Sequence, residues 1–349
     1  MDGELPTIFN VTTNGKAKHY ILPIGKAVGG LFNGVKAVAN FDIPWRENLE
    51  KSFLDIGILH SPSDAIRLKV WMDGISISKE FKPNYSIKVS EKQFSTILLD
   101  VLPIVKRENA RPRSRVVIIN TGPSPFVITH ASLFTILKGG SEKSITYATG
   151  GIGISNNEMK EFRIQEGPWN KVTFSAMLYA QDPPHTIEML ADGKVVKVID
   201  LLKKAEDLEF ATSTQDIKRL GLRRAKDIMG RKKAPTILTS VSVTSSKEED
   251  REMEIEARVK NSGNEELYIQ YTVRNLSNRA MRKVSIVGFA SGSAVYRENI
   301  GDLPEGKEAM REAVVKLPKE ARTFVLRLIW NDGAEVKFLE KRYKERENQ

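Results

Sequence analysis

The sequence predicts a mainly β protein of tandem β-sandwich domains, jelly-roll and immunoglobulin-like, with one short basic helical segment. Three observations lead to this class. Short runs of alternating apolar and polar residues end at Gly, Pro, Asn or Asp along most of the chain. Asp-Gly pairs, which tolerate the positive φ of a tight hairpin, separate such runs at 73–74, 192–193 and 332–333. The 349 residues, 40% of them hydrophobic, suffice for two or three domains with apolar cores.

A first β-sandwich or jelly-roll-like domain is expected over residues 1–140. Strands flank the first Asp-Gly pair, and further apolar runs follow at 85–89, 95–105, 115–120 and 126–137. Many short strands at close spacing favour a sandwich or jelly roll. A second β domain is expected over 141–200, with strands near 161–164 and 172–179 and the second Asp-Gly hairpin.

Residues 201–235 break this pattern and are expected to form a basic helical linker. The segments 201–210 and 214–230 have apolar residues at helical spacing. Thr214 is suited to begin the second helix and Gly230 to end it, although Gly221 weakens its interior.

An immunoglobulin-like β-sandwich is expected over residues 236–349. Seven short strands are predicted, at 236–243, 253–261, 267–275, 284–289, 313–317, 324–330 and 335–339. The run Val259-Lys-Asn-Ser-Gly-Asn, followed by a strand, resembles the turn of CARDB-like archaeal immunoglobulin-like modules. That resemblance implies a fold and no activity.

Composition excludes several kinds of site and points to the cytoplasm. The chain has no cysteine, which excludes disulfides, thiolate zinc sites, iron–sulfur clusters and a cysteine nucleophile. Its first residues lack the apolar stretch of a signal peptide, and no apolar run is long enough for a membrane helix. Abundant Lys, Arg and Glu with little Gln favour a thermophilic, archaeal source.

The search for chemistry yields no catalytic residue, no metal site and no cofactor, so an enzyme is not expected. The four histidines, His19, His60, His130 and His185, have no metal-binding spacing, and no G-x-S-x-G motif supports a Ser-His-Asp site, which only the fold could assemble. His130 is expected in the core or at a strand edge, and His185 in a solvated turn. The glycine-rich stretch 25–36 lacks the Lys-Ser/Thr end of a phosphate-binding loop.

The net charge of +10 is concentrated in two basic clusters. A loop cluster comprises Lys106, Arg107, Arg111, Arg113 and Arg115; a second cluster comprises Lys218, Arg219, Arg223, Arg224, Lys226, Arg231, Lys232 and Lys233. On a helix, Arg219, Arg223 and Lys226 would share one face. The guanidinium group of arginine can donate two parallel hydrogen bonds to a phosphate. Both clusters are therefore candidate contacts for RNA or an acidic partner. The alternative is that these basic side chains lie on a solvated surface, where nearby acidic residues balance their charge.

In size and in its basic, cysteine-free, β-rich composition the chain resembles archaeal ribosome dimerisation (hibernation) factors. The resemblance implies a non-enzymatic cytoplasmic homodimer that binds the RNA and proteins of small ribosomal subunits, bridges two of them and prevents subunit joining. Two alternatives stay open. One is a self-assembling structural protein of a virus-like particle or appendage, which would exchange a flexible segment at 14–40. The other is a carbohydrate-binding jelly roll, which requires an aromatic-lined groove.

Overall fold

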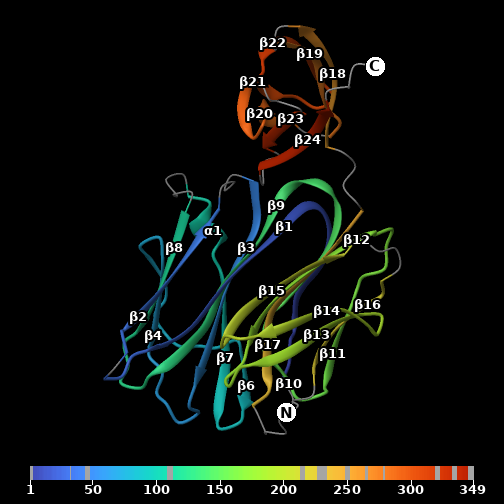
Figure 1. Ribbon diagram of the computed structural model, residues 1–349. Coiled ribbons are helices and arrows are strands. Elements are labelled where there is room, and N and C mark those ends of the chain that lie inside the picture. Colours follow the sequence, from blue (N-terminus) through green and yellow to red (C-terminus); the bar gives the residue numbers. More distant parts are fainter. Residues whose placement is uncertain are drawn as a thin grey trace. The chain divides into compact units, whose positions relative to one another are not determined.

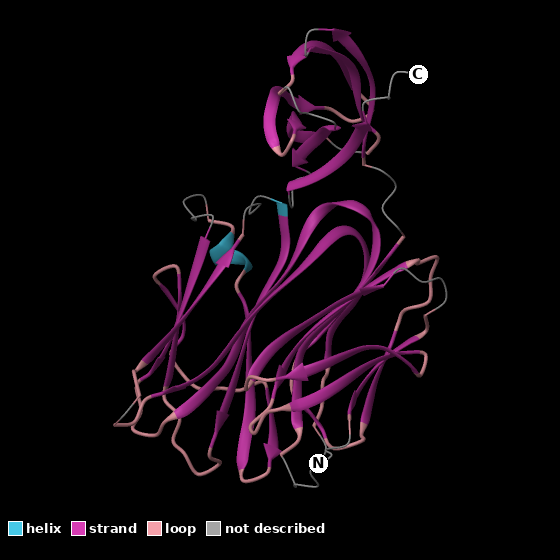
Figure 2. Ribbon diagram, in the orientation of Figure 1, coloured by secondary structure: helices cyan, strands magenta, loops and turns pink. Residues whose placement is uncertain are grey.

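The computed structural model describes residues 3–31, 33–43, 48–107, 113–212, 217–225, 234–247, 252–263, 266–277, 280–318, 323–331 and 336–344. The chain divides into two compact units, residues 1–248 and 249–349. In the described part, 24 strands accompany one four-residue helix, α1 (Leu102–Val105). The mainly β class is therefore confirmed, as Figure 2 shows.

The first half of the first unit is a sandwich of two sheets. The outer sheet has the order β2-β8-β4-β5, and in the inner sheet β3 pairs with β7 and β9, and β7 with β6. The strands are β2 (Lys36–Asp42), β3 (Leu49–His60), β4 (Leu68–Met72), β5 (Ile75–Ser78), β6 (Tyr85–Val89), β7 (Lys92–Asp100), β8 (Arg113–Asn120) and β9 (Phe126–Ala148).

The second half repeats this pairing pattern, except that no described strand corresponds to β6. Its outer sheet has the order β11-β16-β13-β14, and in its inner sheet β12 pairs with β15 and β17 as β3 pairs with β7 and β9. The strands are β11 (Met159–Arg163), β12 (Lys171–Tyr179), β13 (His185–Ala191), β14 (Lys194–Leu201), β15 (Ala205–Thr212), β16 (Arg219–Arg224) and β17 (Thr236–Ser246), with the short β10 (Ile152–Ile154) beside β17. The first unit thus contains one sandwich topology twice.

The Asp-Gly hairpins occupy equivalent places in the two halves. Asp73 and Asp192 both have positive φ, 51° and 45°. The backbone N–H of Asp73 donates to the Arg115 carbonyl, and that of Asp192 to the Arg219 carbonyl. The two predicted hairpins, β4–β5 and β13–β14, are confirmed. The third Asp-Gly pair lies outside the described residues, although β23 and β24 pair on either side of it.

Strands β1 (Thr7–Val28) and β9 join the halves. β9 pairs with β3 along its first part and with β17 along its last, while β1 follows it throughout, and the two strands curve over together in Figure 1. Phe134 and Tyr147, 13 residues apart on β9, consequently stack with ring centroids 4.4 Å apart. The segment 14–40, predicted to be flexible, is instead paired to β9 up to Val28 and continues into β2 from Lys36.

The second unit is a separate sandwich with its own core. Its sheets have the orders β18-β19-β22 and β21-β20-β23-β24. The strands are β18 (Met253–Gly263), β19 (Glu266–Asn275), β20 (Met281–Ala290), β21 (Ser293–Leu303), β22 (Glu308–Lys316), β23 (Thr323–Asn331) and β24 (Val336–Lys344). Between the sheets lie Ile269, Tyr271, Ile286 and Leu328, all buried. β21 was not predicted, and the predicted strand at 236–243 is β17 of the first unit.

The predicted helical linker at 201–235 is wrong where the structure describes it. Residue 201 ends β14, and β15 and β16 occupy most of the described remainder. Leu220 and Leu222 are both buried two residues apart, as on a strand, and pair with β13. Neighbouring strands with open hydrogen-bonding edges outweigh a weak helical spacing. The predicted boundary between two domains at residue 141 is also wrong, because strand β9 runs through that position.

Candidate binding cleft

The outer face of the first half's outer sheet carries an exposed tryptophan. Burial alternates along β4, where Val70 and Met72 are fully buried and Trp71 is 37% exposed. Trp71 pairs across the sheet with Val117 of β8, which is partly exposed on the same face. Alternation on a strand therefore places the indole towards solvent, on a floor of β8 side chains.

The β4–β5 hairpin and α1 wall this face into a cleft. The cavity has a volume of about 630 Å³ and is lined by Trp71, Asp73, Gly74, Ile75, Ile104, Arg107, Arg113, Arg115, Val117 and Ile119. Asp73 holds the β4–β5 hairpin against β8, because its carboxylate accepts hydrogen bonds from the Arg115 backbone N–H (2.7 Å) and the Ser114 hydroxyl (2.8 Å). We call this the Trp71 cleft.

The structure brings three residues of the predicted loop cluster into this cleft. Arg107 follows α1, and Arg113 and Arg115 lie on β8, with the exposed Arg113 Nε 3.0 Å from Asp42 Oδ1. Lys106 is exposed but does not line the cleft, and Arg111 lies outside the described residues. Trp71 was missed at the sequence level, although its outward place between Val70 and Met72 follows from the alternation.

The second predicted cluster does not form a basic helix face. Arg219 contacts Glu161 (3.5 Å), and the Arg223 guanidinium contacts Glu188 (2.6 Å). Arg224 points the other way, is 2% exposed, and donates to the Ala234 carbonyl. Lys218 is exposed, and its backbone N–H donates a hydrogen bond to the Asp192 carboxylate. Lys226, Arg231, Lys232 and Lys233 lie outside the described residues. The described members therefore fit the solvated-surface alternative or the core.

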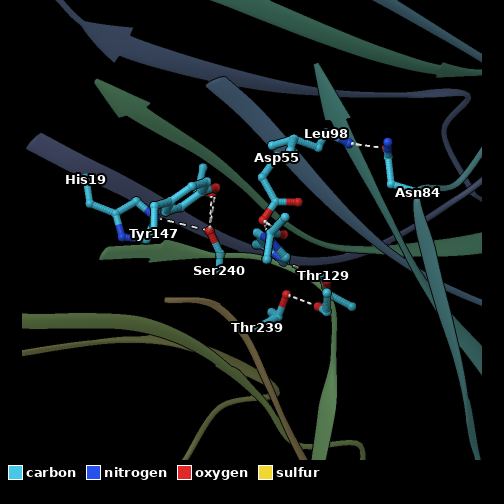
Figure 3. A network of polar contacts seen from close by, with 12 residues as sticks. His19, Asp55, Asn84, Leu98, Thr129, Tyr147, Thr239 and Ser240 are labelled. Atoms are coloured by element: carbon cyan, nitrogen blue, oxygen red, sulfur yellow. Dashed lines mark hydrogen bonds and ion pairs between the residues drawn. The ribbon is translucent and has the colours of Figure 1, made fainter. Parts of the chain in front are cut away.

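A buried polar network lies where the two halves meet (Figure 3). His19 Nε2 is 3.0 Å from Ser240 Oγ, and its Nδ1 lies 3.0 Å from Ser175 Oγ and 3.1 Å from Ser242 Oγ. Burial lowers the pKa of His19 to about 3, a shift that nearby Asp55 partly opposes. Desolvation likewise raises the pKa of Tyr147, whose hydroxyl lies 3.4 Å from Ser240. His19 is therefore held neutral.

The network is not a Ser-His-Asp site. Asp55 accepts a hydrogen bond from Thr149 and lies 3.6 Å from His130 Nε2, whereas the partners of His19 are serines. Asp55, His130 and Ser240 are fully buried, so no substrate reaches them. The network's observed contacts are those of a polar core between the halves.

The remaining histidines have structural contacts. His130 lies in the core, as expected. His185 is 3% exposed and its Nδ1 contacts the hydroxyl of Thr236, the first residue of β17, so the predicted solvated turn is wrong. Among the described residues, no cluster of His, Asp and Glu has metal-binding geometry, and no helix is long and apolar enough to span a membrane.

Comparison with solved structures gives remote matches. No family model and no curated protein matches the chain. Solved structures that match include a β-glucuronidase of Parabacteroides merdae (9% identity, TM-score 0.24), a GH2 β-galacturonidase of Eisenbergiella tayi (13%, 0.21) and a β-D-mannosidase of Dictyoglomus thermophilum (13%, 0.23). These matches cover 56–58% of this chain and 28–35% of the matched chains.

These matches correct the functional prediction. The matched structures are glycosidases, which contradicts the prediction of a non-enzymatic, RNA-binding ribosome hibernation factor. That prediction depended on overall composition and on charge clusters, and three described members of those clusters, Arg113, Arg219 and Arg223, contact carboxylates. TM-scores of 0.21–0.24 assign neither an activity nor a substrate to this chain.

Proposed function

We propose that the first unit binds carbohydrate in the Trp71 cleft. The observation that carries the proposal is a tryptophan, 37% exposed, on the floor of a cavity of about 630 Å³ in a β-sandwich. A flat indole offers a large apolar surface to the C–H face of a sugar ring while its surroundings remain wet. A cavity of this size with an apolar floor and a few convergent polar groups is typical of small-ligand sites.

The residues around the indole supply what a sugar also needs. Val117 and Ile119 extend the apolar floor, and the guanidinium groups of Arg107 and Arg115 carry N–H donors for ring hydroxyls. Trp71, the one aromatic residue among the described lining residues, favours the carbohydrate-binding alternative. The cytoplasmic location and the homodimer remain predictions.

Replacing Trp71 with alanine is expected to weaken glycan binding tenfold or more, because exposed aromatic anchors dominate such contacts. The full chain is screened on an array of oligosaccharides, and the hits are measured by isothermal titration calorimetry. Trp71→Phe should keep part of the affinity.

The matched control is Val198→Ala, which removes an apolar side chain 57% exposed on β14, outside the cleft. It should bind like the unaltered protein. Absence of any glycan binding by the unaltered protein, or unchanged affinity in Trp71→Ala, would overturn the proposal.

A further inference from the structure

The charge of the Trp71 cleft is unbalanced. Three arginines and one aspartate are among its lining residues. The aspartate, Asp73, is turned to the hairpin, where its two carboxylate oxygens accept hydrogen bonds from Arg115 N–H and the Ser114 hydroxyl. The described lining residues therefore carry a net positive charge next to the indole.

Two of the three guanidinium groups make no ion pair with a carboxylate in the described part of the chain. Arg113 contacts Asp42. Arg107 and Arg115 are both exposed, and no ion pair with a described residue involves either. Guanidinium groups without a partner at the rim of a cavity are available to an anionic ligand, which they bind through two parallel N–H donors.

The second half of the unit shows that the sheet does not require these free charges. Arg219 occupies the place of Arg115, since its N–H donates to Asp192 as that of Arg115 does to Asp73. Here Arg219 contacts Glu161, and Leu190 stands where the first half has Trp71. The same framework thus exists with its cation neutralised and its aromatic residue replaced by a buried leucine.

The indole and the free guanidinium lie within the span of one ligand. Trp71 pairs with Val117, and Arg115 is two residues along β8 on the same face. Diagonal neighbours of this kind have Cα atoms about 7–8 Å apart, within reach of long side chains. A ring stacked on Trp71 would place a substituent at Arg115.

We infer that the Trp71 cleft selects acidic glycans, whose sugar rings carry a carboxylate or a sulfate, with Trp71 under the ring and Arg107 and Arg115 on the anionic group. The inference rests on the proposed carbohydrate binding and adds its substrate class. The charged groups at this rim remain partly exposed to water, where dissolved ions screen their attraction. Binding of an acidic glycan should therefore weaken as the salt concentration rises.

The test uses the full chain and three probes: an oligogalacturonate, a heparin-derived oligosaccharide and an uncharged cello-oligosaccharide of the same length. Calorimetry should show tenfold or tighter binding of one acidic probe over the neutral one. Comparing the two acidic probes distinguishes carboxylate from sulfate. The double variant Arg107→Gln/Arg115→Gln should lose this preference, and the equivalent surface variant Arg219→Gln/Arg223→Gln should retain it.

The outcomes separate the two proposals. Equal binding of neutral and acidic probes, unchanged in Arg107→Gln/Arg115→Gln, would overturn the acidic preference and leave carbohydrate binding standing. Binding of none of the probes, and of no glycan on the array, would overturn both. Single-stranded RNA serves as a further polyanion. If it binds as tightly as the acidic probe, and Trp71→Ala leaves both unchanged, the cleft is a general anion surface and the inference fails.

Discussion

Replacing Phe134 with alanine is expected to lower the free energy of unfolding of the first unit by about 3–5 kcal/mol. Phe134 is fully buried inside the curve of β1 and β9, stacked on Tyr147 and 5.3 Å from the ring of Phe9. Truncation removes apolar contact and leaves a cavity. The surrounding strands are held by ladder hydrogen bonds, so they have little freedom to close it.

The measurement is urea denaturation of the full chain followed by circular dichroism, fitted for the transition of the first unit. Phe338→Ala is the control, since that ring is 62% exposed and belongs to the second unit. It should change stability by less than about 1 kcal/mol. A loss below this limit in Phe134→Ala would contradict the close packing of the two arms of β9.

Acidification is expected to destabilise the first unit through His19. Its pKa is about 3 in the folded protein and 6.5 when exposed. Between these values the unfolded chain binds a proton that the folded chain excludes, so stability falls as the pH falls from 6.5 towards 3. If the whole pKa shift acts on folding, the free energy of unfolding falls by about 1.4 kcal/mol for each pH unit within this window.

Paired carboxylates also lose stability in acid, so the comparison with His19→Gln isolates this residue. The variant should be less stable near neutrality, because three serine hydroxyls lose part of their hydrogen bonding, and its stability should fall less steeply with acid. His60→Gln, which removes a buried histidine outside this network, serves as the control. Parallel curves for the unaltered protein and His19→Gln would show that His19 does not exclude the proton.

Several features of the fold could be predicted because they are local. The β4–β5 and β13–β14 hairpins follow from Asp-Gly alone, since the turn needs positive φ at Asp73 and Asp192. The alternation of β4 and β8 likewise follows from one buried face. The local pattern could not show that the two halves repeat one topology. Equivalent strands of the halves have the same place in the order of their sheets, but their amino-acid sequences differ.

The buried network was beyond prediction for a related reason. His19 meets Ser240 and Ser242 across more than 220 residues of chain. Gly57 has no turn to mark it, yet an added Cβ would lie 2.4 Å from the His130 ring. Such requirements arise from packing between strands that are distant in sequence.

By itself the sequence determined the β class, two of the hairpins and the clustering of Arg107, Arg113 and Arg115 in one short segment, although the structure places Arg113 and Arg115 on β8. The tertiary structure decided which charges are free. Glu161 and Glu188 lie 58 and 35 residues from the arginines they contact, so the linear chain could not show that Arg219 and Arg223 are paired. It also decided that Trp71 stands beside Arg115, because cross-strand pairing, and not sequence spacing, brings β4 against β8.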